Sequence, residues 1–135
     1  MQFVDTNIFI RVLAKDDPVK SDRCFELFKK AELGDIELHT SESIISEIVY
    51  VLQSKRLYNL ERVLIAKKLA VILTIRGLKI PHKTILISAL NLYAQNNIDF
   101  EDAILISYTL YSKSKEIYSY DRGIGKIQGI KRLEP

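Results

Sequence analysis

The chain has 135 residues, of which 47% are hydrophobic, and this is the usual size of one domain with a buried core. Apolar residues occur along its whole length without a Ser-, Gly- or Pro-rich tract, so we expect a single domain over residues 1–135. No apolar stretch approaches the roughly 20 residues of a membrane-spanning helix, and no cleavable leader is apparent, so the sequence predicts a soluble cytoplasmic protein without a membrane partner. Cys24 is the only cysteine, which excludes an intramolecular disulfide and a cysteine-based zinc site.

The number of charged residues does not by itself indicate a partner. The net charge is +3, from 20 basic and 17 acidic residues. Setting aside the four acids discussed below leaves 13 of the 17 acidic residues against the 20 basic ones. A basic body around an acidic pocket suits a polyanion, although lysine-rich stretches such as 61–68 are also explained as solvated helix faces.

The first forty residues predict a strand, two helices and a second strand. Residues 2–5 have the pattern of a short strand, and helical spacing of apolar residues begins directly afterwards, so the chain turns from strand to helix near Asp5. Asp17 as cap and Pro18 as first residue begin a second helix, which stops at Gly34. Residues 36–39 form the second predicted strand.

The middle of the chain predicts two further helices and a strand. Thr40 and Ser41 can cap a helix whose apolar stripe extends to Leu52. The next helix runs from about residue 59 to residue 76 and ends at Gly77. Residues 78–81 are then a short strand that a proline stops.

The last third of the chain predicts two helices and two strands. Residues 83–95 have a helical pattern, and residues 101–111 form a helix that is buried over much of its surface. A strand at 116–120 ends at Asp121, and residues 130–134 form an edge strand. Strands that alternate with helices predict an α/β sandwich built on a parallel sheet.

Two candidate site residues, Asp5 and Asp121, lie at the C-terminal ends of predicted strands. Right-handed crossovers bring these ends of parallel strands to one edge of the sheet, where ligands bind in open α/β folds. An unpaired carboxylate is costly in such an apolar neighbourhood, so a cation is a suitable partner. Each acid also has a structural explanation, Asp5 as a helix cap and Asp121 as a turn residue before Gly123.

Two more candidate acids lie on predicted helices. Glu47 is inside an apolar helix, roughly 40° from Val51 around the axis, at the border of the buried stripe. Capping cannot explain it, and the alternative is a solvent-facing glutamate. Asp102 lies in the first turn of a helix that Asp99 would cap, so a capping arrangement that favours acids at the positive end of the helix dipole explains it equally well.

These four acids favour a hard divalent cation. Mg²⁺ and Mn²⁺ prefer carboxylate and water oxygens, whereas His39 and His82 are too isolated to form a zinc site. Such an ion lowers the pKa of bound water and neutralises charge on a phosphate oxygen during in-line displacement, without a covalent nucleophile. The acids do not decide between one ion and two.

Four sequence blocks carry these acids in a distinctive order: VDTN at 4–7, ISEIVYVL at 45–52, DFEDA at 99–103 and SYDRGIGKI at 119–127. Together they resemble the signature blocks of PIN domains, especially the VapC-type toxins of toxin–antitoxin pairs. The resemblance spans nearly the whole chain. It implies a three-layer sandwich with a central, mainly parallel sheet flanked by helices, and a nuclease that hydrolyses RNA phosphodiester bonds.

The resemblance also assigns roles to individual residues. The metal-binding and catalytic acids are Asp5, Glu47, Asp102 and Asp121, and they imply Mg²⁺ or Mn²⁺. Asn7 matches a polar position that orients the first aspartate or a metal-bound water, Ser119 matches the hydroxyl before the last acid, and Thr6 is left as a helix-start residue. Many relatives carry a further acid where this chain has Gly123, which bears on metal affinity and on a second metal.

The resemblance further implies a homodimer and an antitoxin whose C-terminal segment covers the acidic groove. Four basic residues near the acids are candidates for phosphate contacts, with ordinary surface charge as the alternative. They are Arg11, Lys15, Arg122 and Lys126.

Two other functions compete with the metal-dependent endoribonuclease. The first is a catalytically weak or silent PIN-like module that binds RNA or protein, with Gly123 as a sign of an eroded site. The second is a phosphatase or phosphotransfer enzyme in which Asp5 is a covalent nucleophile. That chemistry usually needs a second acid and a lysine nearby, which VDTNIF does not provide.

Overall fold

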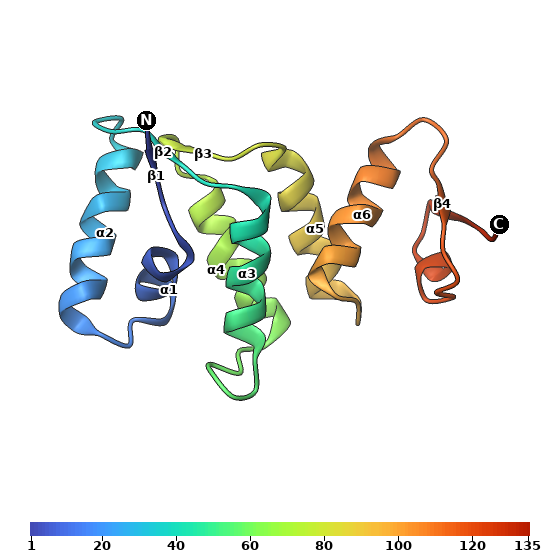
Figure 1. Cartoon of the computed structure of the whole chain (residues 1–135), viewed down its shortest axis with the longest axis horizontal. Coiled ribbons are helices and arrows are strands. Elements are labelled where there is room, and N and C mark those ends of the chain that lie inside the picture. The colour runs from blue at the N-terminus through green and yellow to red at the C-terminus, as the bar shows by residue number, and fades with distance from the viewer. The chain divides into compact units, whose positions relative to one another are not determined.

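The computed structural model describes residues 1–135 and contains six α-helices and five short strands (Figure 1). The chain divides into two compact units, Met1–Lys83 and Thr84–Pro135, which we call unit 1 and unit 2. The predicted α/β class with a parallel sheet is confirmed. That the units form a single domain stays a prediction. None of the helices combines the length and the apolarity that crossing a bilayer requires.

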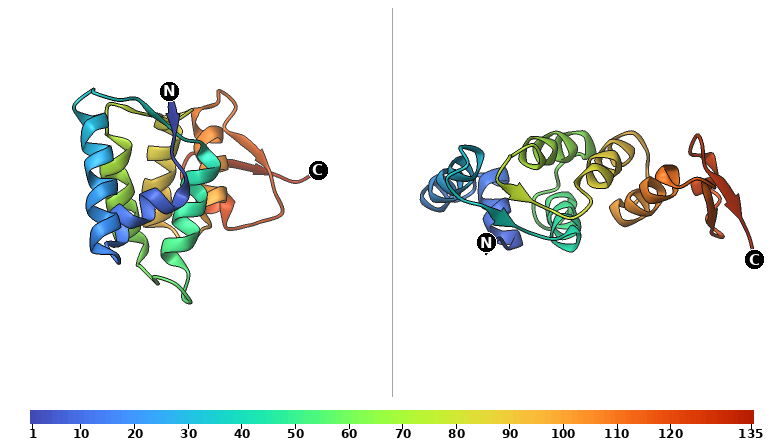
Figure 2. Two further views of the ribbon diagram at one scale, coloured as in Figure 1. Left: turned by 60° about the vertical axis from the view of Figure 1, so that its left-hand side comes forward. Right: turned by 90° about the horizontal axis from the view of Figure 1, so that it is seen from above.

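Unit 1 contains a parallel three-stranded sheet in the order β1-β2-β3. Its elements are β1 (Gln2–Phe3), α1 (Thr6–Ala14), α2 (Pro18–Glu32), β2 (Leu38–His39), α3 (Glu42–Gln53), α4 (Arg62–Leu73) and β3 (Leu78–Lys79). The register pairs Gln2 with Leu38 and Leu38 with Leu78. Seen from above, α2 lies towards one end of unit 1, and α3 and α4 lie next to each other and are in contact (Figure 2).

Local caps explain where the helices of unit 1 begin. The Asp17 carboxylate accepts a hydrogen bond from the Lys20 amide at 3.1 Å, as the sequence predicts for α2. Ser41 rather than Thr40 caps α3, with its hydroxyl accepting from the Ile44 amide at 3.3 Å. Thr40 is buried and donates to the Val4 carbonyl at 3.0 Å, which ties the ends of β1 and β2 together.

The predicted helix over residues 59–76 is too long at both ends. Asn59 has a left-handed backbone (φ 51°) and its amide donates to the Ser54 carbonyl, so it belongs to a turn and α4 begins after Glu61. At the other end, α4 stops at Leu73 with Thr74 as its cap. Gly77 therefore does not end a helix. It lies against the backbone of Ala31 instead.

A single apolar core holds the helices of unit 1 on the sheet. Phe9 on α1 is fully buried, and its ring centroid lies 5.1 Å from that of Phe28 on α2. Fully buried residues from α3, α4 and the strands complete this core: Leu38, Ile45, Ile48, Leu52, Ile65, Leu69 and Leu78. Burying such side chains contributes about 1.5–3 kcal/mol each, which fixes the ends of β1 and α1 where Asp5 lies.

Unit 2 contains two helices and a second sheet. Its elements are α5 (Lys83–Gln95, of which Lys83 belongs to unit 1), α6 (Phe100–Tyr111), β4 (Glu116–Tyr118), the 3-10 helix η1 (Ile124–Lys126) and β5 (Lys131–Leu133). β4 pairs with β5 in parallel. The core of this sheet contains Ile106, Ile117 and Ile124. Because the strands form two sheets, one in each unit, the prediction that Asp5 and Asp121 share a sheet edge is not tested.

Candidate metal centre

Asp5 lies between β1 and α1, where the sequence places it. It occupies the N-cap position of α1 with an extended backbone (φ −89°, ψ 164°), but its side chain makes no capping hydrogen bond. The carboxylate is exposed, and only the Asp5 carbonyl takes part in the first turn, by accepting from the Ile8 amide. Helix capping therefore does not account for this carboxylate, which remains available for a ligand.

Glu47 is held by a hydrogen bond from the neighbour of Asp5. The Thr6 hydroxyl donates to Glu47 Oε2 at 2.8 Å, and Thr6 is only 5% exposed. This bond joins the first residue of α1 to the middle of α3 across 41 positions of sequence. Glu47 itself is exposed, as expected at the border of the buried stripe, but it is not a freely solvated glutamate.

Asp102 lies in the first turn of α6 and is partly buried. Asp99 is at the N-cap position, but its side chain makes no capping hydrogen bond. Burial raises the pKa of Asp102, and the negative charges of Asp99, Asp121 and Glu101 raise it further. Such a group is destabilised as an anion unless a cation lies nearby.

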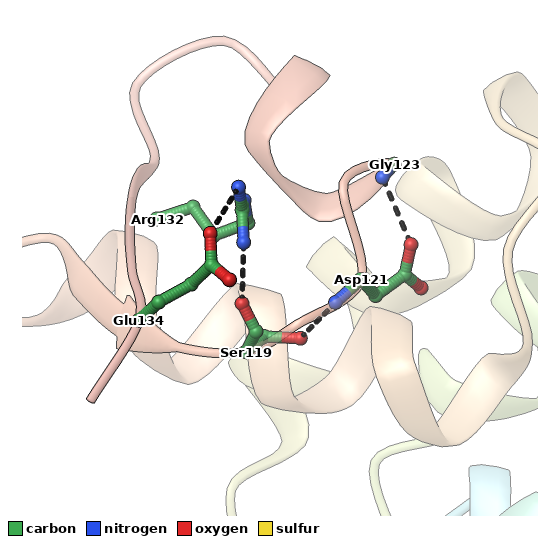
Figure 3. A network of polar contacts seen from close by, with 5 residues as sticks. All are labelled: Ser119, Asp121, Gly123, Arg132 and Glu134. Atoms are coloured by element: carbon green, nitrogen blue, oxygen red, sulfur yellow. Dashed lines mark hydrogen bonds and ion pairs between the residues drawn. The ribbon is translucent and has the colours of Figure 1, made fainter.

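Asp121 follows β4 in a tight turn, three residues after the strand ends at Tyr118 (Figure 3). Its Oδ1 accepts a hydrogen bond from the Gly123 amide at 2.8 Å, which is the turn geometry that the sequence suggested as an alternative. The Asp121 amide in turn donates to the Ser119 hydroxyl at 3.0 Å. The turn leaves Oδ2 without a partner in unit 2, so turn formation and ligand binding are compatible.

Sequence reasoning missed Arg132 as a support for this turn. Its guanidinium donates to the Ser119 carbonyl at 2.7 Å and to Glu134 at 3.2 Å, so β5 holds the residue before the Asp121 turn (Figure 3). The Ser119 amide also donates to the Leu133 carbonyl. Arg132 lies outside the recognised blocks, and no local pattern indicates this contact.

The remaining candidates are polar or basic residues on the surface. Asn7 is exposed at the start of α1. Arg11 forms an ion pair with Asp16 at 3.0 Å, so its charge is already matched. Lys15 ends α1 with a left-handed backbone, and Arg122 and Lys126 are exposed around η1. Their roles as phosphate contacts stay predictions.

The structure thus places the acids as two pairs. In unit 1, the adjacent residues Asp5 and Thr6 are linked to Glu47, and in unit 2 the charge of Asp121 acts on Asp102. Within neither unit do three or more His, Cys, Asp or Glu side chains form a metal cluster. The donors are all carboxylate oxygens, which fits Mg²⁺ or Mn²⁺ rather than zinc.

These features define an α/β protein in which two of the candidate acids follow parallel strands and the other two lie on helices. Comparison with protein families matches residues 3–130 to the PIN domain. The chain belongs to the PIN domain family. This family is generally a metal-dependent nuclease fold and typically uses divalent metal ions. No curated protein matches the sequence closely enough to name a nearer relative.

Proposed function

We propose that this protein is a Mg²⁺- or Mn²⁺-dependent endoribonuclease, and that it is the VapC-type toxin of a type II toxin–antitoxin pair. In this proposal, Asp5, Glu47, Asp102 and Asp121 hold the metal. RNA is the substrate, and the phosphodiester bond is hydrolysed by water. Membership of the PIN domain family supports the nuclease activity.

One observation carries the proposal: Asp102 is an acid placed among acids. Its pKa is raised by burial and by three neighbouring carboxylates, and no basic side chain compensates them. At neutral pH the ionised Asp102 destabilises the folded protein, because its raised pKa means that the anion is less favourable in the folded state than in the unfolded chain. A divalent cation beside Asp102 would remove the repulsion, which supports a role for Asp102 as a metal ligand over a purely structural role at the helix start.

In the proposed reaction, the metal ion and the protein side chains have different roles. When bound, the metal ion lowers the pKa of a water and neutralises charge on the phosphate. Thr6 orients Glu47 by its hydroxyl, and the Gly123 amide fixes the rotation of Asp121. Asp102 must be ionised to act as a ligand, so its raised pKa predicts that metal binding strengthens as the pH rises.

The partners follow from the toxin proposal. A homodimer and an antitoxin that covers the acidic groove are expected for a VapC-type toxin, and an antitoxin with a basic side chain would neutralise the same carboxylates as the metal. Co-expression with the product of a short neighbouring gene, followed by co-purification and an inhibition assay, tests the antitoxin. Light scattering of the pure protein tests the homodimer.

A cleavage assay tests the enzyme itself. Wild-type protein is incubated with a mixed RNA pool in Mn²⁺ or in EDTA, beside Asp5→Asn and the matched control Asp35→Asn, which removes an exposed acid elsewhere in unit 1. We expect cleavage by wild type and Asp35→Asn in Mn²⁺, and at least a hundredfold loss in EDTA or with Asp5→Asn. Equal cleavage in EDTA, or none by folded wild type, contradicts the proposal.

Gly123 favours a second candidate, a catalytically silent module that binds RNA or protein. Where many relatives have an acid, this chain supplies a backbone amide that binds Asp121. The same assay separates the candidates when RNA binding is measured in parallel, because the silent module binds RNA and does not cut it in any metal.

A further inference from the structure

A groove between α1 and α2 lies next to Asn7, two residues after Asp5. It has a volume of about 360 Å³ and is lined by Asn7, Ile8, Arg11, Lys20, Arg23 and Cys24. Three of these six residues are basic and none is acidic. The volume is within the about 300–1,000 Å³ typical of small-ligand sites.

The basic residues of this α1–α2 groove differ in their availability. Arg11 is bound to Asp16, and hydrogen bonds from Tyr58 and Arg11 lower the pKa of Asp16, which therefore stays ionised. Lys20 and Arg23 are exposed, and their side chains make no ion pair or hydrogen bond. They are three positions apart on α2, which places both charges on the same face of the helix.

The floor of the α1–α2 groove is apolar. Its apolar lining residues are Ile8, which is partly exposed, and Cys24, which is 9% exposed. An apolar floor beside two unpaired cations suits a chain that alternates flat, weakly polar bases with negative phosphates. An acidic peptide would match the cations but would offer less apolar surface to the floor.

We propose that the α1–α2 groove binds the backbone of single-stranded RNA on its way to the acidic site, with phosphates on Lys20 and Arg23 and a base or ribose against Ile8 and Cys24. This proposal rests on the proposed function, since it names the path of the substrate. Asn7, which lines the groove, follows Asp5 by two residues in the sequence.

Binding in the absence of metal tests the groove separately from catalysis. A fluorescein-labelled single-stranded RNA is titrated in EDTA with wild type, with Lys20→Gln/Arg23→Gln and with the control Lys29→Gln/Lys30→Gln. The control removes two charges from the other end of α2. We expect the groove variant to bind roughly tenfold more weakly, and the slope of log K against log salt to fall by about 1.4, or 0.7 for each lost phosphate contact.

Crosslinking tests the location directly. RNA that contains 4-thiouridine is irradiated with the wild-type protein and the adducts are mapped by mass spectrometry. We expect adducts within residues 7–24. Adducts confined to other segments overturn the proposal, even if the groove variant binds weakly.

The outcomes distinguish this proposal from the proposed function. If wild type cuts RNA in Mn²⁺ but the groove variant binds and cuts equally well, the groove proposal alone fails. If wild type binds RNA through the groove but cuts nothing, the nuclease proposal alone fails. Displacement of the RNA by polyglutamate at equal charge concentration would show that the groove recognises acidic protein segments, which also overturns the RNA assignment.

Discussion

At the scale of single residues, the Thr6 hydroxyl fixes the position of the Glu47 carboxylate. Thr6 is buried and directly follows Asp5. Its hydroxyl donates a hydrogen bond to Glu47 rather than to the backbone of the helix that it begins. Under the proposed function Glu47 is a metal ligand, and replacing a residue that orients such a ligand typically changes metal affinity or activity by about 10–100-fold. Sequence alone left Thr6 as a helix-start residue because its partner is 41 positions away.

Replacing Thr6 by valine should therefore impair catalysis without unfolding the protein. Valine keeps the shape but removes the donor, so we expect RNA cleavage in Mn²⁺ to fall about 10–100-fold. Thr6→Ser keeps the donor and should retain most activity. Initial rates report the loss, and urea denaturation checks that stability changes by less than about 1 kcal/mol. Equal rates for the valine and serine variants would show that the bond does not orient Glu47.

Asp102 makes a prediction about pH in the absence of metal. Its pKa in the folded protein is raised, so the unfolded chain loses this proton first and stability falls as the pH rises from the ordinary value near 3.8 towards the folded value. At pH values above the folded pKa, the folded protein carries the full destabilisation by the ionised Asp102. In EDTA, Asp102→Asn should therefore melt at a higher temperature than wild type at pH 8, and the difference should shrink at pH 4.

The control for this experiment is Asp35→Asn, whose carboxylate lies in unit 1. It should follow the wild-type pH dependence. A melting temperature for Asp102→Asn that stays below that of wild type at pH 8 in EDTA would mean that the protein already stabilises the Asp102 anion, and it would contradict the need for a cation beside Asp102.

At the scale of the elements, the sequence predicts helices better than strands. Asp17 and Ser41 mark the starts of α2 and α3 because capping is a local interaction. The strands are only two or three residues long, shorter than every predicted run, because their length depends on a partner strand rather than on local pattern. The same reason hides the pairing of β4 with β5, on which Arg132 depends.

Gly77 gives a prediction at this scale, because it lies where α2 and β3 meet. A Cβ atom at this position would be 2.3 Å from the Ala31 carbonyl oxygen and 2.7 Å from that of Ile36. Both contacts are with backbone, so the elements must separate. We expect Gly77→Ala to lower the free energy of unfolding by about 1–3 kcal/mol or more, measured by urea denaturation.

Gly125→Ala is the matched control for Gly77→Ala. Its Cβ would meet only the Arg132 side chain, at 3.4 Å, which is an ordinary contact with a flexible group. This variant should be neutral or slightly stabilising, since alanine restricts the unfolded chain. A Gly77→Ala protein as stable as Gly125→Ala would show that α2 and β3 can move apart freely.

At the scale of the whole molecule, the four acids of the proposed function are divided between the two units. Asp5 and Glu47 belong to unit 1, and Asp102 and Asp121 belong to unit 2. The sequence blocks predict this set because each acid has a local signature, but they carry no information on how tightly the pairs cooperate. Whether the two pairs of acids bind one metal ion together can be measured from the stabilisation that the metal gives to single and double variants.

Mn²⁺ should stabilise the protein by linkage, by about 2.7 kcal/mol at a hundred times the dissociation constant. If all four acids bind the same metal, Asp5→Asn and Asp121→Asn should each remove most of this gain, and the double variant should lose little more than either. Thermal melting against Mn²⁺ concentration provides the measurement, with Asp35→Asn as control. Additive losses would indicate separate metal sites, and no Mn²⁺-dependent gain in wild type would contradict a metal centre.

The division of the acids between the units also has a consequence for biosynthesis. A ribosome that has translated unit 1 has supplied Asp5 and Glu47, while Asp102 and Asp121 are both within the next 52 residues, from 84 to 135. At about 5–20 residues per second, these take roughly 3–10 s to add. Under the proposed function, a nascent or prematurely terminated chain that stops before Asp102 lacks two of its four metal ligands, so it cannot form the proposed site even when unit 1 has folded.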